Sequence, residues 1–303
     1  MNIVVFGGTG LIGRAFCRYA LMNNHVPIIV SRNPDRFDIP YKKISYTDAG
    51  KPVLQRMLSD EYAVVNLTGA GIANKRWSKQ RKKVLERSRI EMLERIEVFL
   101  QQAPQEPEVF VQASAIGFYG DKGDVNVDED STQGNNYLSW LTEEWESAFK
   151  EMSLEDTRKV IIRTGIVLTK DGGVLPKMLT AYNAFVGGPL GVGNQFLSWI
   201  HIEDEVRAIM HLIEDSYARG AFNLTAPVPV TMKHFAQTLG AILDKSSFFR
   251  VPAFLLKLLF GQMAQETMLT GAKVLPKRLM EHEFEFIFTD VDLALRNLLL
   301  KKQ

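Results

Sequence analysis

The sequence predicts an α/β protein in which helices cover both faces of a doubly wound parallel sheet, followed by a smaller and mostly helical lobe. Three observations lead to this class. The chain begins with a short apolar segment, a glycine-rich turn and an amphipathic helix. Helical segments of ten residues or more then alternate with apolar segments at 25–32, 61–71, 110–120 and 159–168, as expected for parallel strands with crossover helices. Beyond residue 231 helical patterns predominate.

Composition and charge narrow the class of protein. The chain has 303 residues, 46% of them hydrophobic, enough for one large domain or two unequal lobes that share a core. Lysine and arginine total 36 against 35 acidic residues, so bulk charge predicts neither nucleic acid nor an anionic membrane as a partner. The single cysteine, Cys17, fits a reducing compartment, and the apolar stretch 251–260 is far shorter than the roughly 20 residues of a membrane span. The N-terminus lacks a signal-peptide pattern, and we expect a cytoplasmic protein.

The first element is the most informative. Residues 2–6, NIVVF, are typical of a buried parallel strand, and GGTGLIG and a helical pattern follow directly. Gly7 and Gly8 permit a tight turn, and Gly10 lets backbone N–H groups approach a pyrophosphate. Gly13 lets the helix pack closely on the strand, so that the positive end of the helix faces the phosphates. The cofactor contacts predicted here are Gly7, Gly8, Thr9, Gly10, Leu11, Ile12 and Gly13.

The second strand, at 25–32, indicates which dinucleotide binds. An NAD site usually has an acidic residue about 20 residues past the glycines, bound to the ribose 2′-hydroxyl. This chain has Ser31 and Arg32 there instead. A hydroxyl and a guanidinium can both bind a 2′-phosphate, which an acid would repel, so NADP(H) is favoured. Asp35 lies in a loop with proline and is expected to face water.

The remaining strands predict the rest of the cofactor crevice. In parallel α/β sheets, ligands bind at the carboxyl ends of the strands. The segment 61–71 leads into a loop of small residues, and the segments 110–120 and 159–168 are further strands of the same sheet. The residues expected along the crevice are Leu67, Thr68, Gly69, Ala113, Ser114 and Val167.

Several motifs together resemble a known superfamily. GGTGLIG, NLTGAG, SAIGFYG, RTGIVL and WIHIEDEVRAI resemble the extended short-chain dehydrogenases/reductases, the group that contains nucleotide-sugar epimerases. VSR, the NLTG–RW pair, GGPLGVGNQ, SWIHIED and GAKVLPKRL resemble one atypical branch, named epimerase-family proteins or cell-division-inhibitor homologues. The resemblance covers essentially the whole chain. It implies a Rossmann domain that binds NADP(H), at 1–168 and 194–224, and a cleft-forming lobe of unassigned role at 169–193 and 225–303.

Tyr137 stands where active members of that superfamily have a catalytic tyrosine followed, four residues on, by lysine. The ammonium group is needed because a phenol with a pKa of about 10 is only about 0.1% ionised at neutral pH. In this chain Leu141 occupies the lysine position. The aromatic and leucine side chains around Tyr137 recur at helical intervals, while Glu143, Glu144 and Glu146 take the other side of the helix. We therefore predict a packed amphipathic helix without the usual tyrosine–lysine pair.

Three other residues are candidates for the site. Ser114 follows the strand where the superfamily has its substrate-binding serine, and Tyr119 lies between two glycines. Either neutral hydroxyl could donate to a substrate carbonyl, although Ser114 could instead bond the backbone and the turn could fix the position of Tyr119. Arg89 occupies the helix position where epimerases place an asparagine near the nicotinamide ribose. A guanidinium there could hold the ribose or the pyrophosphate.

The basic run at 74–83, NKRWSKQRKK, carries six positive residues and raises the possibility of nucleic-acid binding. It opens a long predicted helix that continues with many glutamates, so a solvated, charge-balanced face is the better interpretation. The predicted apolar stripe of that helix includes Val84, Met92, Ile96 and Phe99. The Arg76–Trp77 pair belongs to the branch's motif, which could bring it to the crevice.

The rest of the sequence predicts structural roles. The histidines lack metal-ligand spacing, and we predict no metal site. Asp204 is expected to bond local backbone at a helix start, with His201 beside it in a structural role. Residues 281–288, EHEFEFIF, alternate as a half-buried strand does. The helices expected in the C-terminal lobe lie at 232–243, 252–262 and 290–300.

Two functions remain open from the sequence. One is an NADP(H)-dependent oxidoreductase or epimerase-like enzyme with non-standard catalytic groups, acting on a small molecule such as a carbonyl compound or a sugar nucleotide. The other is a non-catalytic NADPH-dependent sensor whose C-terminal lobe is read by a partner. The missing lysine favours the sensor, and Ser114 together with the glycine turn favours the enzyme. The sequence leaves the substrate and the oligomeric state open.

Overall fold

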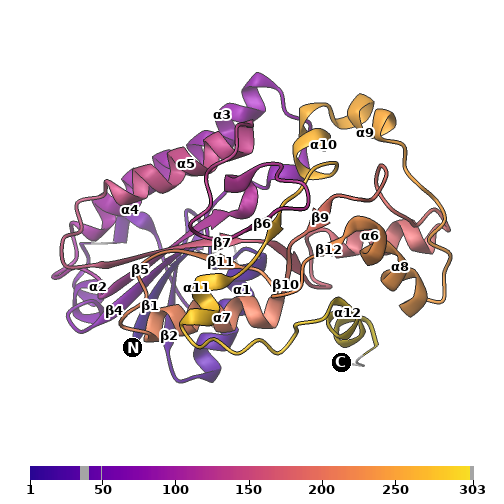
Figure 1. The fold of residues 1–303 in the computed structure, drawn as a ribbon. Helices are drawn as coiled ribbons and strands as arrows, with labels where there is room; N and C mark the ends of the chain where they lie inside the picture. The colour runs from indigo at the N-terminus through magenta and orange to yellow at the C-terminus, as the bar shows by residue number, and fades with distance from the viewer. Residues whose placement is uncertain (35–40, 49, 301–303) are drawn as a thin grey trace.

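The sheet and its covering helices form the larger part of the molecule. A computed structural model describes residues 1–34, 41–48 and 50–300. Seven strands form one parallel sheet in the order β11-β7-β5-β4-β1-β2-β3, with helices on both faces (Figure 1). The predicted α/β class with a doubly wound parallel sheet is confirmed. The strands of this sheet are β1 (Asn2–Phe6), β2 (Val26–Val30), β3 (Lys42–Ile44), β4 (Tyr62–Asn66), β5 (Val109–Ala115), β7 (Arg158–Thr164) and β11 (Gly220–Leu224).

Alternating side chains divide the core between the two faces of the sheet. On β1, Ile3 and Val5 join the cluster formed with α1 and α7, whereas Val4 and Phe6 join the cluster formed with α4 and α5. Successive strand residues point to opposite faces, so a continuous apolar run supplies both clusters. The helices of this region are α1 (Leu11–Met22), α2 (Pro52–Met57), α3 (Lys79–Arg87), α4 (Ile90–Leu100), α5 (Tyr137–Lys150) and α7 (Ile202–Glu214).

The strand order reverses between β1 and β4. From β1 the chain proceeds to β2 and β3 on one side of it and then crosses to β4 on the other. At the carboxyl ends of this pair, Phe6 lies opposite Asn66. Such a reversal leaves a crevice in which α/β sheets bind ligands. The fold therefore places the glycine turn that follows β1 beside the loop that follows β4.

Residues 159–168, predicted as one strand, form two strands because the chain changes sheets at Gly165. β8 (Ile166–Leu168) leaves the main sheet and pairs with β10 (Trp199–His201). A Cβ atom at Gly165 would lie 2.6 Å from the carbonyl oxygen of Ser198. Only glycine permits so close an approach of the two backbones.

The long helix predicted to open with the basic run 74–83 begins only at Lys79 and is two helices, α3 and α4. The chain breaks at Ser88, whose hydroxyl accepts a hydrogen bond of 3.0 Å from the N–H of Ala70 in the loop after β4. Val84 precedes the break and is 40% exposed, so its place in the predicted apolar stripe was wrong. Ile96 and Phe99 follow the break and are buried as predicted.

The C-terminal lobe has its own apolar cluster, to which α6, α8 and α12 contribute. The helix predicted at 252–262 is α9, which ends before Gly261, where φ is +61°; α10, which was not predicted, begins at the next residue. The strand predicted at 281–288 was wrong: these residues belong to no strand, because the chain runs along α7 without a pairing partner. The elements of this part are α6 (Leu175–Asn183), β9 (Phe196–Leu197), β12 (Val230–Thr231), α8 (Met232–Ile242), α9 (Ala253–Phe260), α10 (Gln262–Thr267), β13 (Lys273–Val274), α11 (Lys277–Glu281) and α12 (Val291–Leu300).

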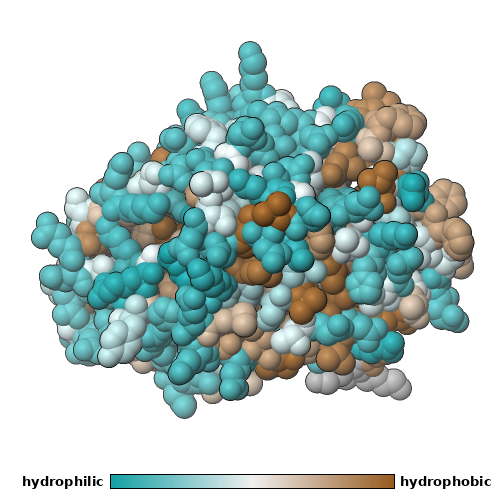
Figure 2. Space-filling model, in the orientation of Figure 1, coloured by the Kyte–Doolittle hydropathy of each residue, from teal (hydrophilic) through white to brown (hydrophobic). Residues whose placement is uncertain are grey.

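The surface is mainly hydrophilic, with apolar side chains gathered at one corner of the view, over α9 (Figure 2). One further connection ties the lobe to the sheet region: β13 pairs in parallel with β6 (Asn126–Val127), which follows β5. Among the helices that the structure describes, none combines the length and the apolar character needed to cross a membrane.

Candidate functional site

The glycine turn after β1 brings three backbone segments into contact. Gly7 has a φ of +82°, and a Cβ atom there would lie 2.7 Å from the carbonyl carbon of Leu67, in the loop after β4. At Gly13, a Cβ atom would overlap the carbonyl oxygen of Gly7, so α1 packs directly on the turn. The N-cap of α1, Gly10, provides no side-chain acceptor, and the first turn carries no acidic residue. The first N–H groups of α1 are therefore suited to bind an anionic ligand.

Two cavities lie beside this turn. The smaller, of about 160 Å³, is lined by Ser31, Arg32 and Asn33 from the end of β2 together with Thr9 and Tyr46. The larger, of about 570 Å³, shares part of this lining and extends along α3 and α4. The shared residues are Gly7, Thr9, Arg32, Tyr46 and Thr68. The glycine turn, the predicted Ser31–Arg32 pair and the loop after β4 thus face one continuous space. Asp35 lies outside the described residues.

Two residues of this space had no signal in the sequence. Tyr46 comes from the segment after β3, and Arg95 comes from α4; both line the larger cavity with Arg32. Burial raises the pKa of the Tyr46 phenol, and the positive charges of Arg32 and Arg95 oppose that rise. The two guanidinium groups therefore flank the phenol closely enough to influence its ionisation. Because an arginine pair of this kind attracts phosphate, the cavity is electrostatically suited to a phosphorylated ribose.

Arg89 lies beneath the loop after β4. Its Nη1 donates to the carbonyl oxygens of Ala70, at 3.2 Å, and Leu85, at 3.1 Å, and its guanidinium lies 4.9 Å from the ring centre of Trp145. The side chain is 8% exposed, and burial lowers the pKa of the guanidinium to about 10. A Cβ atom on Gly69 would lie 3.3 Å from that group. Arg89 thus supports the crevice loop from inside the fold, and its direct contact with a cofactor stays a prediction.

The other predicted crevice residues lie within strands or directly after them. Leu67 donates its N–H to the carbonyl oxygen of Phe6 at 2.8 Å, which continues the pairing of β1 and β4 by one residue. Thr68 Oγ1 donates to Asn66 Oδ1 at 2.6 Å. Ala113 and Val167 are partly buried against the sheet core. Leu67 and Thr68 line the larger cavity.

Ser114 and Tyr119 belong to a buried polar network. Ser114 Oγ donates to Glu146 Oε1 at 2.7 Å, and Arg163 binds both oxygens of Glu146 at 2.8 Å each. Arg163 Nη1 donates to the Tyr119 hydroxyl at 3.0 Å, and that hydroxyl donates to Asn223 Oδ1 at 2.7 Å. The prediction that Glu146 takes the outer side of its helix was wrong: its side chain is 1% exposed. The buried carboxylate of Glu146 is stabilised because the guanidinium of Arg163 and the hydroxyl of Ser114 both donate hydrogen bonds to it.

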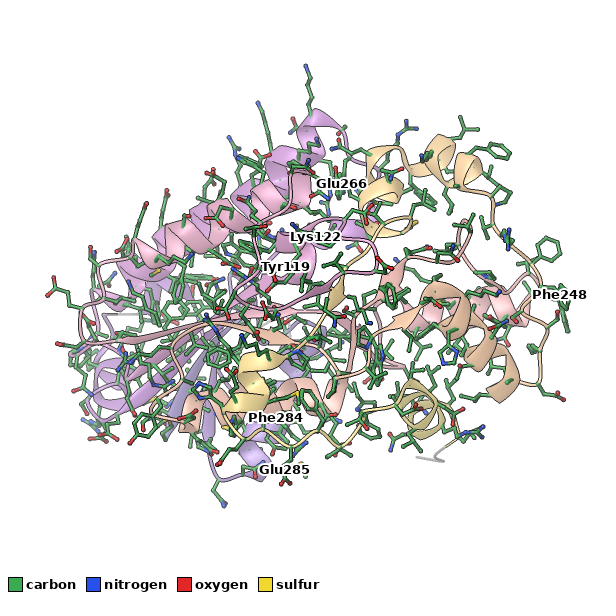
Figure 3. The ribbon with its side chains drawn as sticks, in the orientation of Figure 1. Tyr119, Lys122, Phe248, Glu266, Phe284 and Glu285 are labelled. Carbon is green, nitrogen blue, oxygen red and sulfur yellow. The ribbon has the colours of Figure 1, made fainter. Side chains whose placement is uncertain are left out.

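Both candidate hydroxyls, those of Ser114 and Tyr119, already donate hydrogen bonds within this network. Tyr119 is fully buried, and burial raises the pKa of its phenol to about 12 in spite of the charge of Arg163. Its proton is directed to Asn223, and the proton of Ser114 is directed to Glu146. Figure 3 shows Tyr119 inside the molecule, with Glu266 of α10 nearer the top of the view. Both hydroxyls are therefore neutral donors held within the fold.

Tyr137 opens α5 and is turned toward α3. Its hydroxyl bonds Glu86 Oε1 at 3.2 Å, and Lys82 Nζ lies 4.1 Å from the centre of its ring. Burial, followed by the nearby charge of Glu86, raises the pKa of the Tyr137 phenol above its ordinary value. The ring also meets Trp77 edge-on at 5.2 Å between ring centres. This environment stabilises the neutral phenol. Trp140, predicted to pack, is 43% exposed.

The start of α7 contains a second buried acid that the sequence analysis missed. Glu205 is fully buried, its Oε1 accepts from Thr164 Oγ1 at 2.8 Å, and its Oε2 has no hydrogen-bond partner among the described residues. Burial raises the pKa of this carboxyl to about 8. The neighbouring Asp204 was predicted to bond local backbone. Instead it accepts from the N–H groups of Ile287, at 3.0 Å, and Phe288, at 2.8 Å, which fastens the C-terminal segment to α7.

His201 has the structural place predicted for it. Its Nδ1 accepts from the N–H of Glu203 at 3.1 Å at the start of α7, and its ring stacks on Phe288 at 3.8 Å. Within the part of the chain that the structure describes, there is no group of three or more histidine, cysteine, aspartate or glutamate side chains arranged to hold a metal ion.

The glycine turn at the switch point of the sheet places this chain among the Rossmann-type dinucleotide-binding proteins, and more narrowly among those with the short-chain dehydrogenase/reductase fold. A family model described as the NAD dependent epimerase/dehydratase family matches residues 3–225, and the chain belongs to that family. A second model, described as a domain of unknown function (DUF1731), matches residues 251–298.

Relatives match over nearly the whole chain. The Arabidopsis thaliana protein named epimerase family protein SDR39U1 homolog, chloroplastic, is 37% identical over 98% of this chain and 86% of its own length. The human epimerase family protein SDR39U1 is 32% identical over 98% of this chain and 99% of its own length. A crystal structure of human SDR39U1 (isoform 2) with NADPH has a TM-score of 0.88 and 31% identity, covering 98% of this chain and 99% of that one. The predicted resemblance to epimerase-family proteins is confirmed.

Proposed function

We propose that this chain binds NADP(H) and acts as an oxidoreductase or nucleotide-sugar-epimerase-like enzyme on a small molecule, either a carbonyl compound or a sugar nucleotide. The observation that carries the proposal is the continuous space that joins the glycine turn to Ser31, Arg32, Tyr46 and Arg95. NADP(H) differs from NAD(H) by one phosphate on the adenosine ribose. Among the described residues, the smaller cavity is lined by hydroxyls and the Arg32 guanidinium and by no carboxylate, and Glu91 of the larger cavity is paired with Arg87 at 3.1 Å. The human relative SDR39U1 was crystallised with NADPH, which supports the same cofactor.

Different residues of the crevice would bind different parts of the cofactor. The N–H groups of the turn and the first turn of α1 would hold the pyrophosphate, since neither a Cβ atom nor an acidic side chain obstructs that position. Ser31 and Arg32 would hold the 2′-phosphate, with Arg95 approaching from α4. When bound, the nicotinamide would supply or accept a hydride. Leu67, Thr68, Ala113 and Val167 would line the path toward it from the strand ends.

The proposed acid is a neutral hydroxyl. Tyr137 is followed four residues later by Leu141, and its phenol faces Glu86. A phenolate stabilised by lysine is therefore not the proposed base. The candidates remain Ser114 and Tyr119, each of which would have to exchange its present acceptor for a substrate oxygen. For Tyr119 this means that the proton now directed to Asn223 would turn toward the cleft.

The same hydrogen bonds favour a second function. Because both hydroxyls are already satisfied within the fold, the chain could bind NADP(H) without turning over a substrate and act as a sensor whose C-terminal lobe a partner recognises. Unlike the enzyme, a sensor needs no hydroxyl free to meet a substrate. A cytoplasmic location remains a prediction that rests on the single cysteine.

Fluorescence of NADPH on titration with the pure protein tests the cofactor, and the decay of that signal in a screen of aldehydes, ketones and sugar nucleotides tests turnover. We expect saturable binding, and oxidation with at least one class of carbonyl. Failure to bind NADPH would contradict both functions. Binding with turnover that survives unchanged in a Ser114→Ala and Tyr119→Phe double variant would remove both candidate acids. Binding without turnover across the screen would favour the sensor.

A further inference from the structure

Helix α9 presents an unusual amount of apolar surface to solvent. Among its residues, Phe254 is 72% exposed, Leu258 is 67% exposed and Leu259 is 54% exposed, whereas Leu256 is buried. Scattered single apolar residues are normal on a protein surface, but contiguous ones mark an interaction surface. We call the following set the apolar tip: Phe248, Phe249, Phe254, Leu255, Leu258 and Leu259.

The apolar tip stands out from the body of the molecule. α9 lies at a corner of the ribbon, and Phe248 points away from the fold at the edge of the view (Figures 1 and 3). Phe248 is 94% exposed, so its ring has almost no packing partner within the chain. The tip is thus a convex projection. A convex apolar surface suits a partner that deforms around it.

Positive charge surrounds the tip. Arg76 Nη1 donates to the carbonyl oxygen of Leu258 at 3.2 Å, and Lys82 Nζ donates to Gln262 Oε1 at 2.9 Å. These contacts place the basic run 74–83 directly against α9 and α10. Residues 245–261 add further lysines and an arginine and contain no acidic residue. The whole chain has a net charge of only +1, whereas at this corner the basic residues of 74–83 and 245–261 outnumber the nearby acidic residues Glu86 and Glu266.

We propose that the apolar tip and the basic run form a peripheral binding surface for an anionic lipid bilayer. Phenylalanine and leucine side chains would enter the headgroup region to a shallow depth, and the surrounding lysines and arginines would bind lipid phosphates. α9 has 8 residues, so the helix lies at the surface and does not cross the bilayer. The location lies outside the cofactor crevice, so this inference does not depend on the proposed function.

Two other occupants fit the same surface less well. A second copy of this chain would bring one basic rim against another, and like charges across an interface oppose association. Nucleic acid would match the charge and its bases could stack on the phenylalanines, but it would gain nothing from the exposed leucines of α9. An anionic bilayer complements both the exposed apolar side chains and the positive charge. The expectation of no membrane partner used the charge of the whole chain, whereas this proposal rests on the local charge around α9.

Co-sedimentation of the full chain with vesicles tests the proposal. One set is phosphatidylcholine alone and the other includes phosphatidylglycerol, in about 0.1 M salt, where charges interact over about 10 Å. We expect binding to the anionic vesicles and much weaker binding to the neutral ones. The Phe254→Ser and Leu258→Ser double variant should lower the affinity about tenfold or more, because each apolar side chain lost from the bilayer weakens partitioning by about that factor.

The basic run is tested separately with a Lys79→Glu and Lys83→Glu double variant. It should bind anionic vesicles at least about tenfold more weakly, while its weak binding to neutral vesicles stays the same. Matched controls replace comparable exposed residues elsewhere on the surface: Tyr217→Ser with Leu293→Ser, and Lys170→Glu with Arg219→Glu. Circular dichroism and the unfolding midpoint verify that each variant folds. The control variants should bind as the parent chain does.

Four results would overturn the proposal. The parent chain could fail to sediment with anionic vesicles, or bind neutral and anionic vesicles equally. The tip variant could bind as tightly as its control. Light scattering could show instead that the parent forms a dimer and that the tip variant is a monomer, which would assign the surface to a second copy of the chain.

Discussion

Arg163 on β7 binds both carboxylate oxygens of Glu146 on α5 at 2.8 Å, and the two side chains are 5% and 1% exposed. Burial alone would lower the pKa of the Arg163 guanidinium, but the hydrogen bonds and charge of Glu146 outweigh burial and raise it. The pair links the helix to the sheet directly beneath Ser114 and Tyr119. It therefore fixes the positions of the two hydroxyls that the proposed chemistry requires.

Breaking this pair should destabilise the fold. Glu146→Gln leaves the Arg163 charge buried without its partner, and we expect the free energy of unfolding to fall by about 3 kcal/mol. Urea denaturation measures the change. Glu144→Gln on the same helix is the control, because Glu144 is exposed and its loss should change stability by less than about 0.5 kcal/mol. Equal effects for the two variants would show that the buried pair contributes no special stability.

Arg32→Ala should weaken NADPH binding by about 10- to 100-fold and change NADH binding little, because the lost hydrogen bonds are charge-assisted and go to the 2′-phosphate. Arg95→Ala should have a smaller effect of the same kind. Fluorescence titration with the two cofactors separates the cases, and Arg56→Ala, at the end of α2 and outside both cavities, is the control. Equal losses of affinity for NADPH and NADH would show instead that Arg32 binds a part that the two cofactors share.

Glu205 should make stability fall as pH rises. Its pKa is raised by burial from 4.5 to about 8, so the folded chain holds a proton that the unfolded chain releases. Between these two values the folded state binds more protons, and the free energy of unfolding decreases with pH. Glu205→Gln should remove this dependence and stabilise the protein at pH 8 by at least about 2 kcal/mol.

Urea denaturation at pH 5.5 and pH 8 measures the effect of Glu205. Glu203→Gln is the matched control, because Glu203 lies in the same helical turn and is exposed. A pH dependence that is identical in the parent and in Glu205→Gln would show that other groups govern the titration.

The local features of the cofactor crevice could be predicted from the sequence. The positive φ of Gly7 and the contact of Gly13 with the turn arise within one strand, turn and helix, and Ser31 and Arg32 follow directly from the end of the next strand. Arg95 could not be predicted in the same way. It lies on a helix whose other charged residues are glutamates, and the packing of α4 against the sheet is what brings it to the cavity.

The buried acids escaped prediction for a different reason. A glutamate at a helical interval is normally taken as solvent-facing, and Glu146 followed that rule in sequence. Its burial depends on Arg163, which lies 17 residues later in the chain, on a strand. Nothing in the sequence around Arg163 indicates that it pairs with Glu146. Glu205 was missed because it stands between Asp204 and Val206 in an acidic helix start. Whether such a glutamate is buried depends on its partners in the tertiary structure, and a single sequence does not reveal those partners.

Tyr137→Phe should leave turnover of any substrate nearly unchanged. The phenol of Tyr137 faces Glu86 and has a raised pKa, so it is poorly suited to serve as a base, and its ring packs against Trp77. Tyr119→Phe is the informative comparison, because it removes a candidate acid; we expect it to lower turnover about 100-fold, the scale of a lost acid–base group. Steady-state kinetics with the substrate found in the NADPH screen measures both variants. A loss of about 100-fold in Tyr137→Phe with none in Tyr119→Phe would reverse the assignment and return catalysis to the start of α5.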